Sequence, residues 1–416
     1  MELVKAKFKQ TEVGLIPIDW EVSTIEDVAK VVGGGTPSTT ISDYWKGNIE
    51  WFTPTEISHV KYSSSSIRKI SIEGFNNSSA QILPIGTILM TTRASIGDMS
   101  ILLNEATTNQ GFQSLIAKER IYNEFLYYLM LTKKGELLKN ASGSTFLEIS
   151  PKKVKAIYIP IPPNIHEQKA IATALSDVDD LIANLDKLIT KKKAIKQGAM
   201  QQLLKGKIRL KGFESNSGYK QSELGLIPSD WDVKSLPEVF DYIHGKAHEQ
   251  FIDKSGNYKV VNSKYVSSEG KVVKYSKQNF CPARQGDILT VLSDLPNGKA
   301  LAKTFYVEKD NFHAVNQRVC IWRSKKDDSL FLNYVMNRHK YFLKFDDGVT
   351  QTHILNHHIE KCPVLVPRNI NEQKAIGQCL REMQLELESL ETKKAKYHNF
   401  KQGMMQELLT GKTRLI

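Results

Sequence analysis

The feature that most constrains this chain is an internal repeat. Residues 9–22 read KQTEVGLIPIDWEV and residues 220–233 read KQSELGLIPSDWDV, so ten of the fourteen positions are identical. Farther along, NIHEQKAIATAL at 164–175 matches NINEQKAIGQCL at 369–380. Because the matching segments recur in the same order, the chain is two copies of one structural unit.

The second copy ends as the first does. KQGAMQQLLKGKIRL at 196–210 matches KQGMMQELLTGKTRL at 401–415, again at an offset of 205 residues. The middles differ, since residues 33–110 have little resemblance to residues 244–317. The pattern favours one scaffold that carries two different recognition surfaces. Drift after duplication, without selection for difference, is the alternative.

Each copy predicts a long helix after its globular part. Apolar residues recur at heptad spacing from Ile171 onward and again from Ile376, and no proline interrupts either run. We expect Leu181 and Leu188 to lie beside the seams, and the following residues to form them: Ile171, Leu175, Val178, Ile182, Leu185, Ile189, Ile376, Leu380, Met383, Leu387, Leu390, Tyr397, Phe400, Met404 and Leu408.

The helix ends are also marked. Asn164 with Glu167, and Asn369 with Glu372, have the spacing of a capping box, in which Asn accepts an orphan amide and Glu reaches back. Gly206 and Gly411 are the residues at which we expect the two helices to end. Each helix is then about 40 residues, or about 60 Å long.

Charge is polarised along both helices. Acidic residues crowd each first half, whereas residues 187–211 contain nine basic residues and no acid. A parallel pair would set like charges against each other, and an antiparallel pair sets acid against base. We therefore expect an antiparallel pair that returns the C-terminus to the first globular part. A helical hairpin without a measuring role is the simpler alternative.

Composition bounds the class of protein. The chain has 416 residues, is 41% hydrophobic and carries a formal charge of +12. This length fits two or three domains, and the basic excess suggests a polyanionic partner such as nucleic acid. The sequence shows no apolar run of membrane-spanning length and no signal core, so we expect a cytoplasmic protein. The four cysteines lack CxxC spacing and are interpreted as reduced thiols.

With these segments in view, the chain resembles the specificity subunit of type I restriction-modification systems. The resemblance is carried by GLIPIDW at 14–20, GLIPSDW at 225–231, GGTPS at 34–38 with Tyr44-Trp45, the two EQKAI segments at 167–171 and 372–376, and both LLxGKxRL ends. It covers nearly the whole chain, twice and in the family's order. One departure is that the second copy lacks a GGTPS-like segment, with Gly245 to His248 nearby.

The resemblance implies a non-catalytic subunit with two target-recognition domains and two antiparallel helices. It implies binding to double-stranded DNA with a bipartite, asymmetric site, and to two modification subunits that bring S-adenosylmethionine and methylate adenine. A restriction-motor subunit can join such a complex. No cofactor or metal is expected on this chain itself.

Catalytic signatures are weak. Gly411-Lys412-Thr413 lacks the first P-loop glycine, because Gln406 stands there, and it follows a helix. His244 and His248 have metal-ligand spacing, but Gly245 disfavours a helix. Two alternatives to DNA reading stay open: a duplicated scaffold that binds proteins, and a DNA enzyme with an unrecognised site.

DNA contacts need donors and acceptors for base edges, and Lys or Arg for phosphates. In the first copy, polar loops and strand ends supply the candidates Thr36, Ser38, Lys61, Arg68, Thr91, Thr92, Arg93, Ser95, Ser144 and Thr145. In the second copy they are Lys246, His248, Gln250, Lys264, Tyr265, Ser293, Lys299, Gln351, Thr352 and His353. Gln351 is the sharpest base-reading hypothesis, because Gln can pair bidentately with adenine.

The predicted fold class is α+β, with two mixed α/β target-recognition domains in a pseudo-twofold tandem repeat, separated by two long antiparallel coiled-coil helices. The expected boundaries are 1–160 for the first domain, 161–210 for the first helix, 211–365 for the second domain and 366–416 for the second helix.

Overall fold

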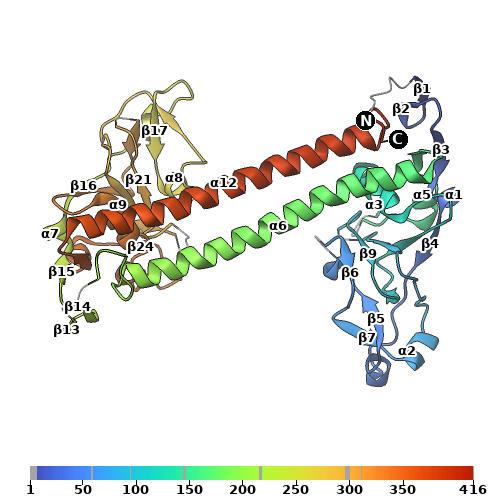
Figure 1. The fold of residues 1–416 in the computed structure, drawn as a ribbon, viewed down its shortest axis with the longest axis horizontal. Coiled ribbons are helices and arrows are strands. Elements are labelled where there is room, and N and C mark those ends of the chain that lie inside the picture. Colours follow the sequence, from blue (N-terminus) through green and yellow to red (C-terminus); the bar gives the residue numbers. More distant parts are fainter. Residues whose placement is uncertain are drawn as a thin grey trace. The chain divides into compact units, whose positions relative to one another are not determined.

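The fold is seen in a computed structural model, which describes residues 7–57, 60–93, 95–143, 147–214, 218–295, 300–310 and 312–415. The chain forms two compact units (Figure 1). Unit 1 comprises residues 1–186 and 392–416, and unit 2 comprises residues 187–391. Each unit therefore holds one half of each long helix.

In unit 1 the strands are β1 Phe8–Thr11, β2 Gly14–Pro17, β3 Glu21–Thr24, β4 Ala29–Gly33, β5 Ile49–Phe52, β6 Tyr62–Ser63, β7 Arg68–Ile70, β8 Ile88–Met90, β9 Met99–Leu102, β10 Ala106–Thr108, β11 Gln113–Ala117 and β12 Tyr158–Ile161. The helices are α1 Ile25–Val28, η1 Ser42–Trp45, η2 Pro54–Glu56, α2 Ile72–Asn76, α3 Asn123–Thr132, α4 Lys134–Asn140, α5 Pro151–Lys155 and the first part of α6 Ile165–Leu203.

In unit 2 the strands are β13 Tyr219–Ser222, β14 Gly225–Pro228, β15 Trp231–Ser235, β16 Phe240–His244, β17 Tyr258–Val261, β18 Tyr275–Ser276, β19 Ile288–Val291, β20 Ser293–Asp294, β21 Thr304–Tyr306, β22 His313–Val315, β23 Val319–Ser324, β24 Thr352–His353 and β25 Pro363–Pro367. The helices are α7 Leu236–Val239, η3 Glu249–Phe251, α8 Ser263–Ser267, α9 Ser329–Met336, α10 Lys340–Leu343, α11 Asn356–Glu360 and α12 Ile370–Leu408.

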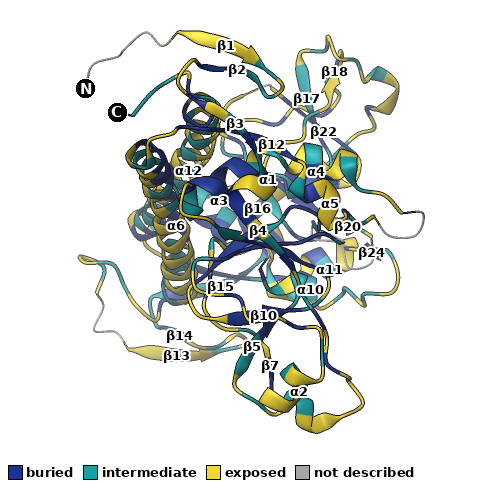
Figure 2. Cartoon of the chain, turned by 90° about the vertical axis from the view of Figure 1, so that its right-hand side faces the viewer, coloured by how far each residue is buried: buried dark blue, intermediate teal, exposed yellow. Residues whose placement is uncertain are grey.

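The sheets repeat between the units, which confirms the predicted duplication. The order β4-β11-β8-β9 in unit 1 corresponds to β16-β23-β19-β21 in unit 2, and the three-stranded sheet β10-β5-β7 corresponds to β22-β17-β18. In each smaller sheet the central strand pairs parallel with one neighbour and antiparallel with the other. The hairpins β1-β2 and β13-β14 also match, down to the register, and the first strand of each is largely exposed (Figure 2). The mixed α+β class is thus the observed one.

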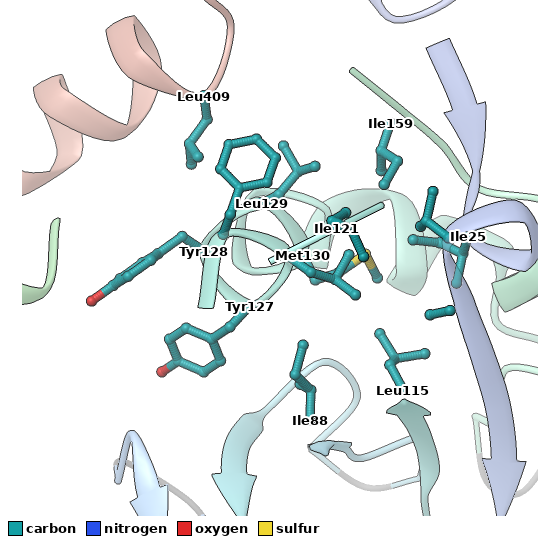
Figure 3. Close-up of a cluster of buried hydrophobic side chains, with 14 of the residues drawn as sticks. Ile25, Ile88, Leu115, Ile121, Tyr127, Tyr128, Leu129, Met130, Ile159 and Leu409 are labelled. Carbon is teal, nitrogen blue, oxygen red and sulfur yellow. The ribbon is translucent and has the colours of Figure 1, made fainter. Parts of the chain in front are cut away.

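A buried helix links the central sheet of unit 1 to the long helices. Side chains of α3 lie between Leu409 of α12's end and the sheet residues Ile88 and Leu115 (Figure 3). Ile171 and Leu175 of α6 belong to the same core. Since α3 has apolar side chains all round, it is covered on every side, as expected for a helix of that composition.

The long helices run antiparallel within each unit, as the distribution of charge along each helix predicted. In unit 1, Lys401 of α12 pairs with Asp179 of α6 at 2.6 Å. In unit 2, Lys192 of α6 pairs with Glu386 of α12 at 2.6 Å. The seam residues from Ile171 to Ile189 in the two main columns are buried. Phe400 is exposed, so its placement in a seam was wrong. Leu181 and Leu188, which were expected beside the seam, are exposed as well, so the buried seam is narrower than the row of apolar residues.

The helix starts are capped by Asn, but the paired Glu has another role. The Oδ1 atoms of Asn164 and Asn369 accept the amides of His166 and Asn371 at 2.9 and 3.0 Å. The prediction that Glu167 and Glu372 reach back to the cap was wrong. Both are almost fully buried and accept bonds from an arginine at the far end of a long helix.

The helix ends meet the GLIPxDW segments. Arg414 binds Glu167 and, at 2.8–2.9 Å, the carboxylate of Asp19, and its guanidinium lies 5.7 Å from the Trp20 ring centroid. In unit 2, Arg209 binds Glu372 and Asp230 in the same way, and its guanidinium lies beside the ring of Trp231. These bonds lower the pKa of Asp19 and Asp230 below the ordinary range. The chain end is therefore fastened to the start of unit 1, as expected.

Glycine is required where each helix stops. Gly206 and Gly411 have φ of 62° and 70°, the left-handed region. A Cβ on Gly411 would lie 2.5 Å from Pro17 and 3.2 Å from Trp20, and Gly206 meets Pro228 and Trp231 equally closely. The predicted stops are confirmed, and the close approach explains why both copies keep this residue type.

Candidate nucleic-acid interface

In unit 1 three candidates gather beside the small sheet, at the side of the unit away from α6 (Figure 1). The guanidinium of Arg68 lies 3.5 Å from the centroid of the Trp45 ring, and Trp45 Nε1 donates to the backbone oxygen of Ser38 at 3.1 Å. Thr36 Oγ1 donates to Gln110 Oε1 at 2.5 Å. Thr36, Ser38, Arg68 and Gln110 are all exposed, so the cluster presents an arginine, an amide and two hydroxyls to solvent.

Gln110 was not among the candidates predicted from the sequence. The pair Asn109-Gln110 does recur in the second copy as Asn316-Gln317. In both units the Asn side chain organises the loop: Asn109 Oδ1 accepts the Gly111 amide at 2.8 Å, and Asn316 Oδ1 accepts the His248 amide at 3.2 Å. The adjacent glutamines are exposed. The recurrence of the pair was the available signal.

A second cluster forms where the central sheet meets the segment before the long helix. In unit 1 Arg93 forms a bridge with Glu148 and an ion pair at 2.9 Å. In unit 2 the equivalent partners are Ser293 and His353, with Thr352 opposite Asp294. Gln351 Nε2 donates to Ser293 Oγ at 3.0 Å. In unit 2 sequence candidates from two distant segments are thus brought together, whereas in unit 1 the partner of Arg93 is Glu148, which was not a candidate.

Several candidates in unit 1 need correction because they lie inside the fold. Thr91 and Thr92 are buried, and their hydroxyls donate to backbone oxygens of Ser95 and Gly111. Lys61 binds Glu124 at 2.9 Å and Ser176 of α6 at 2.8 Å. Burial opposes its charge, yet the bonds to Tyr62 and Glu124 raise its pKa. These three side chains hold the fold together and offer no surface donor, whereas Ser95 remains half-exposed.

Unit 2 requires the same kind of correction. His248 is buried, with Nδ1 2.6 Å from the Lys246 oxygen and Nε2 accepting the Phe280 amide at 3.0 Å, so its ring orders a loop. Tyr265 is buried against His313, at 3.0 Å. Thr352 and Ser293 are buried as well. Exposed positions remain at Lys246, Gln250, Lys264 and His353, with Gln351 half-exposed.

Ser144, Thr145 and Lys299 lie outside the described residues. In the part of the chain that is described, no group of three or more His, Cys, Asp and Glu side chains could hold a metal ion. Nor does any described helix have the length and apolarity needed to cross a membrane.

Comparison with known proteins gives a consistent result. The family model described as the type I restriction modification DNA specificity domain matches residues 17–197 and 228–396. The type I restriction enzyme MjaIX specificity subunit of Methanocaldococcus jannaschii is 40% identical over 240 residues, 56% of this chain and 55% of that protein, about half its length. The MjaVIII specificity subunit of the same organism is 26% identical over 98% of this chain and 96% of its own.

A solved structure shares the fold. The S subunit of a type I restriction-modification system from M. genitalium covers 97% of this chain and 99% of its own, with a TM-score of 0.60 at 16% identity. The two matches of the family model divide the chain as the internal repeat does, since one falls in each copy.

Proposed function

The chain belongs to the type I restriction-modification DNA specificity family, and from this premise we propose that each unit reads one half of a bipartite, asymmetric DNA site. One observation carries the proposal. The same junction between sheet and pre-helix segment occurs in both units, but it presents Arg93 with Glu148 in one and Ser293, Gln351 and His353 in the other. A conserved frame with different polar groups is what two different half-sites require.

The readers we propose are the exposed and half-exposed members of the clusters. In unit 1 these are Thr36, Ser38, Arg68, Gln110 and Arg93, and in unit 2 they are Lys246, Gln250, Lys264, Gln351 and His353. Arg can bind guanine and Gln can bind adenine in a bidentate manner, whereas lysine binds phosphates. The functional boundaries we propose are the sequence-based ones, at 1–160, 161–210, 211–365 and 366–416.

The proposed partners are two modification subunits, one for each unit. The outer face of α6 supports this, because Leu181, Leu188 and Ile195 are exposed at heptad spacing. Exposed apolar columns on a helix are typical of protein contacts. The modification subunits would supply S-adenosylmethionine and methyl transfer, and a restriction-motor subunit would supply cleavage, so this chain contributes specificity without catalysis. We place the assembly in the cytoplasm, where the DNA is.

The test is the methylation pattern. This chain, expressed with its modification subunit in a methylation-free host, should produce a single two-part adenine motif with a fixed gap, as seen by single-molecule sequencing. Exchanging residues 1–160 for those of a related subunit should change one half of the motif only. An assembled, active complex that methylates without a defined motif would contradict the proposal and favour the protein-binding scaffold.

A further inference from the structure

Unit 2 contains an open cleft with a volume of about 1060 Å³. Its lining comes from α6 and α12 together with the strands β17, β21 and β22 and the helices α8 and α9. Seven basic and four acidic side chains line it, so the cleft is basic. The volume suits a ligand of nucleotide size, at the upper end of the roughly 300–1,000 Å³ of small-molecule sites.

The lining of the cleft differs from unit 1 at matched positions. In unit 1, Tyr128 on α3 donates to Asp179 of α6 at 2.7 Å, and Lys401 of α12 pairs with the same carboxylate at 2.6 Å. Tyr334 matches Tyr128, since FLYYLM at 125–130 aligns with FLNYVM at 331–336, but Gln384 stands at the aspartate position. Asn333 stands where unit 1 buries the ring of Tyr127.

The exchange also leaves a lysine without its carboxylate. Lys196 corresponds to Lys401, and its ammonium donates to the neutral Oε1 of Gln384 at 2.5 Å. Burial lowers the pKa of Lys196, and the nearby Arg381 acts in the same direction, although Glu269 and Glu388 oppose it. The ammonium also lies 5.7 Å from the centroid of the Tyr334 ring. A partly buried cation that contacts an amide and a ring, and pairs with no carboxylate among the described residues, favours an anionic ligand.

Further cations in the cleft are available for a ligand. Lys193 and Lys303 pair with Glu391 and Glu269. Within the described ranges, by contrast, the lysines at the other side of the cleft form no ion pair; they are Lys259, Lys271 and Lys309. The positive charge of the cleft is thus only partly neutralised by the protein.

Aromatic and polar groups of the lining suit a base and sugar. The Tyr265 ring lies 5.1 Å from that of Phe305 and its hydroxyl is 3.0 Å from His313 Nε2. Among the described residues, His313 Nδ1 and Asn333 Oδ1 are buried without a hydrogen-bond partner. One nitrogen and one oxygen without partners beside aromatic rings match a ligand that both donates and accepts.

We propose that this cleft binds a nucleotide, with Lys196 as the central phosphate ligand and the aromatic wall beside the base. The ligand is either a free nucleotide or one nucleotide of a nucleic-acid strand, since both present the same phosphate and base. In unit 1 the matched lysine, Lys401, is paired with Asp179 instead. This inference goes beyond the proposed half-site reading, because none of the readers proposed for unit 2 lines the cleft.

The test is calorimetric titration of the full chain with ADP, and with inorganic pyrophosphate as a probe without a base. Lys196→Gln removes the central cation, and Gln384→Asp installs the carboxylate that neutralises the lysine in unit 1. Each change should weaken ADP binding roughly tenfold or more, because a charge-assisted bond to phosphate is lost. Lys401→Gln is the matched control in unit 1, and Lys394→Gln is a second control, at a half-exposed helical lysine that pairs with Asp186.

ADP binding that is weakened by both unit 2 changes and kept by both controls would support the site, and tighter binding of ADP than of pyrophosphate would support the role of the aromatic wall. Competition by a single-stranded oligonucleotide would identify the strand as the source, and its absence would identify a free nucleotide. Absence of ADP and pyrophosphate binding, or an equal loss in Lys401→Gln and Lys196→Gln, would overturn the proposal. Circular dichroism of each variant separates loss of a site from loss of fold.

Discussion

The two units have the same frame and differ in how they treat the same positions. Where unit 1 sets Lys401 against the carboxylate of Asp179 beside Tyr128, unit 2 sets Lys196 against the amide of Gln384 beside Tyr334, at an open cleft. Where unit 1 pairs Arg93 with Glu148, unit 2 pairs Ser293 with His353. In contrast, the arginine bridge at the end of each long helix is the same in both units. The duplicated contacts therefore fix the frame, and the exchanged ones give each unit its own surface.

The largest effect is expected at the shared arginines. Arg414→Ala or Arg209→Ala leaves a carboxylate buried and unpaired, since Glu167 is 3% and Glu372 1% exposed. Breaking a buried pair in this way costs about 3–5 kcal/mol of the free energy of unfolding. The measurement is urea unfolding of each variant. Arg368→Ala, at an exposed pair with Asp232, is the control and should lower the free energy of unfolding far less, because solvent screens this pair. Similar losses in all three variants would mean that the arginine bridges are not part of the frame.

As the pH falls, unit 2 should lose stability at a higher pH than unit 1. Burial lowers the pKa of His313 and of His339 from 6.5 to about 4. In the folded protein both rings stay neutral to a lower pH than in the unfolded chain. Their contribution to the free energy of unfolding is therefore complete above pH 6.5 and is lost as the pH falls toward 4. For His313 the loss amounts to about 3 kcal/mol. Carboxylates with lowered pKa, such as Asp19 in unit 1, lose their contribution only at lower pH.

Hydrogen exchange at several pH values, corrected for intrinsic rates, distinguishes the two units. The amides of the β19 and β23 strands should lose protection between pH 6.5 and 4 sooner than those of β8 and β11. The His313→Gln, His339→Gln double variant should flatten the pH dependence in unit 2 whatever its absolute stability. Earlier loss of protection in unit 1 over this range would contradict the assignment.

A smaller and more local effect is expected on base discrimination. Arg68→Ala should relax discrimination at one half-site, and Gln351→Ala at the other, each by about 1–3 kcal/mol or roughly tenfold. The measurement is the methylation rate of the assembled complex on duplexes with single-base substitutions. Lys139→Ala, an exposed residue of α4, is the control and should leave both halves unchanged. Relaxation of both halves by one variant would show that the units do not read separately.

The smallest effect concerns the helix pair. Lys401→Met should cost more free energy of unfolding than Lys394→Met, because the Lys401–Asp179 pair is 18% and 23% exposed, against 32% and 52% for Lys394–Asp186. An exposed pair contributes about 0.2–1 kcal/mol and is screened by salt. Denaturant unfolding of both variants at low and at high salt measures the contribution of each ion pair and how far salt screens it. A larger loss at Lys394 would contradict this ranking by burial.

Much of the frame could be predicted from the sequence because it depends on local or repeated patterns. Heptad spacing and an Asn cap set α6 and α12, and the charge distribution set their antiparallel direction. The candidate site was harder, because polar residues at strand ends can point outward or inward. Thr91 and His248 turned inward to satisfy backbone groups, whereas Arg68 stacked on Trp45 at the surface. Such a choice depends on neighbours that are distant in the chain.

The sequence by itself determined that this protein is a duplicated frame with two long helices and a specificity function, because repeats, heptads and family motifs are read along the chain. Only the tertiary structure decided that Glu167 and Glu372 bind arginines rather than caps, since their partners lie 247 and 163 residues away. It also decided that Lys196 faces a glutamine and an open cleft, whereas Lys401 faces a carboxylate. Burial and long-range pairing set these outcomes, and neither is visible in local residue order.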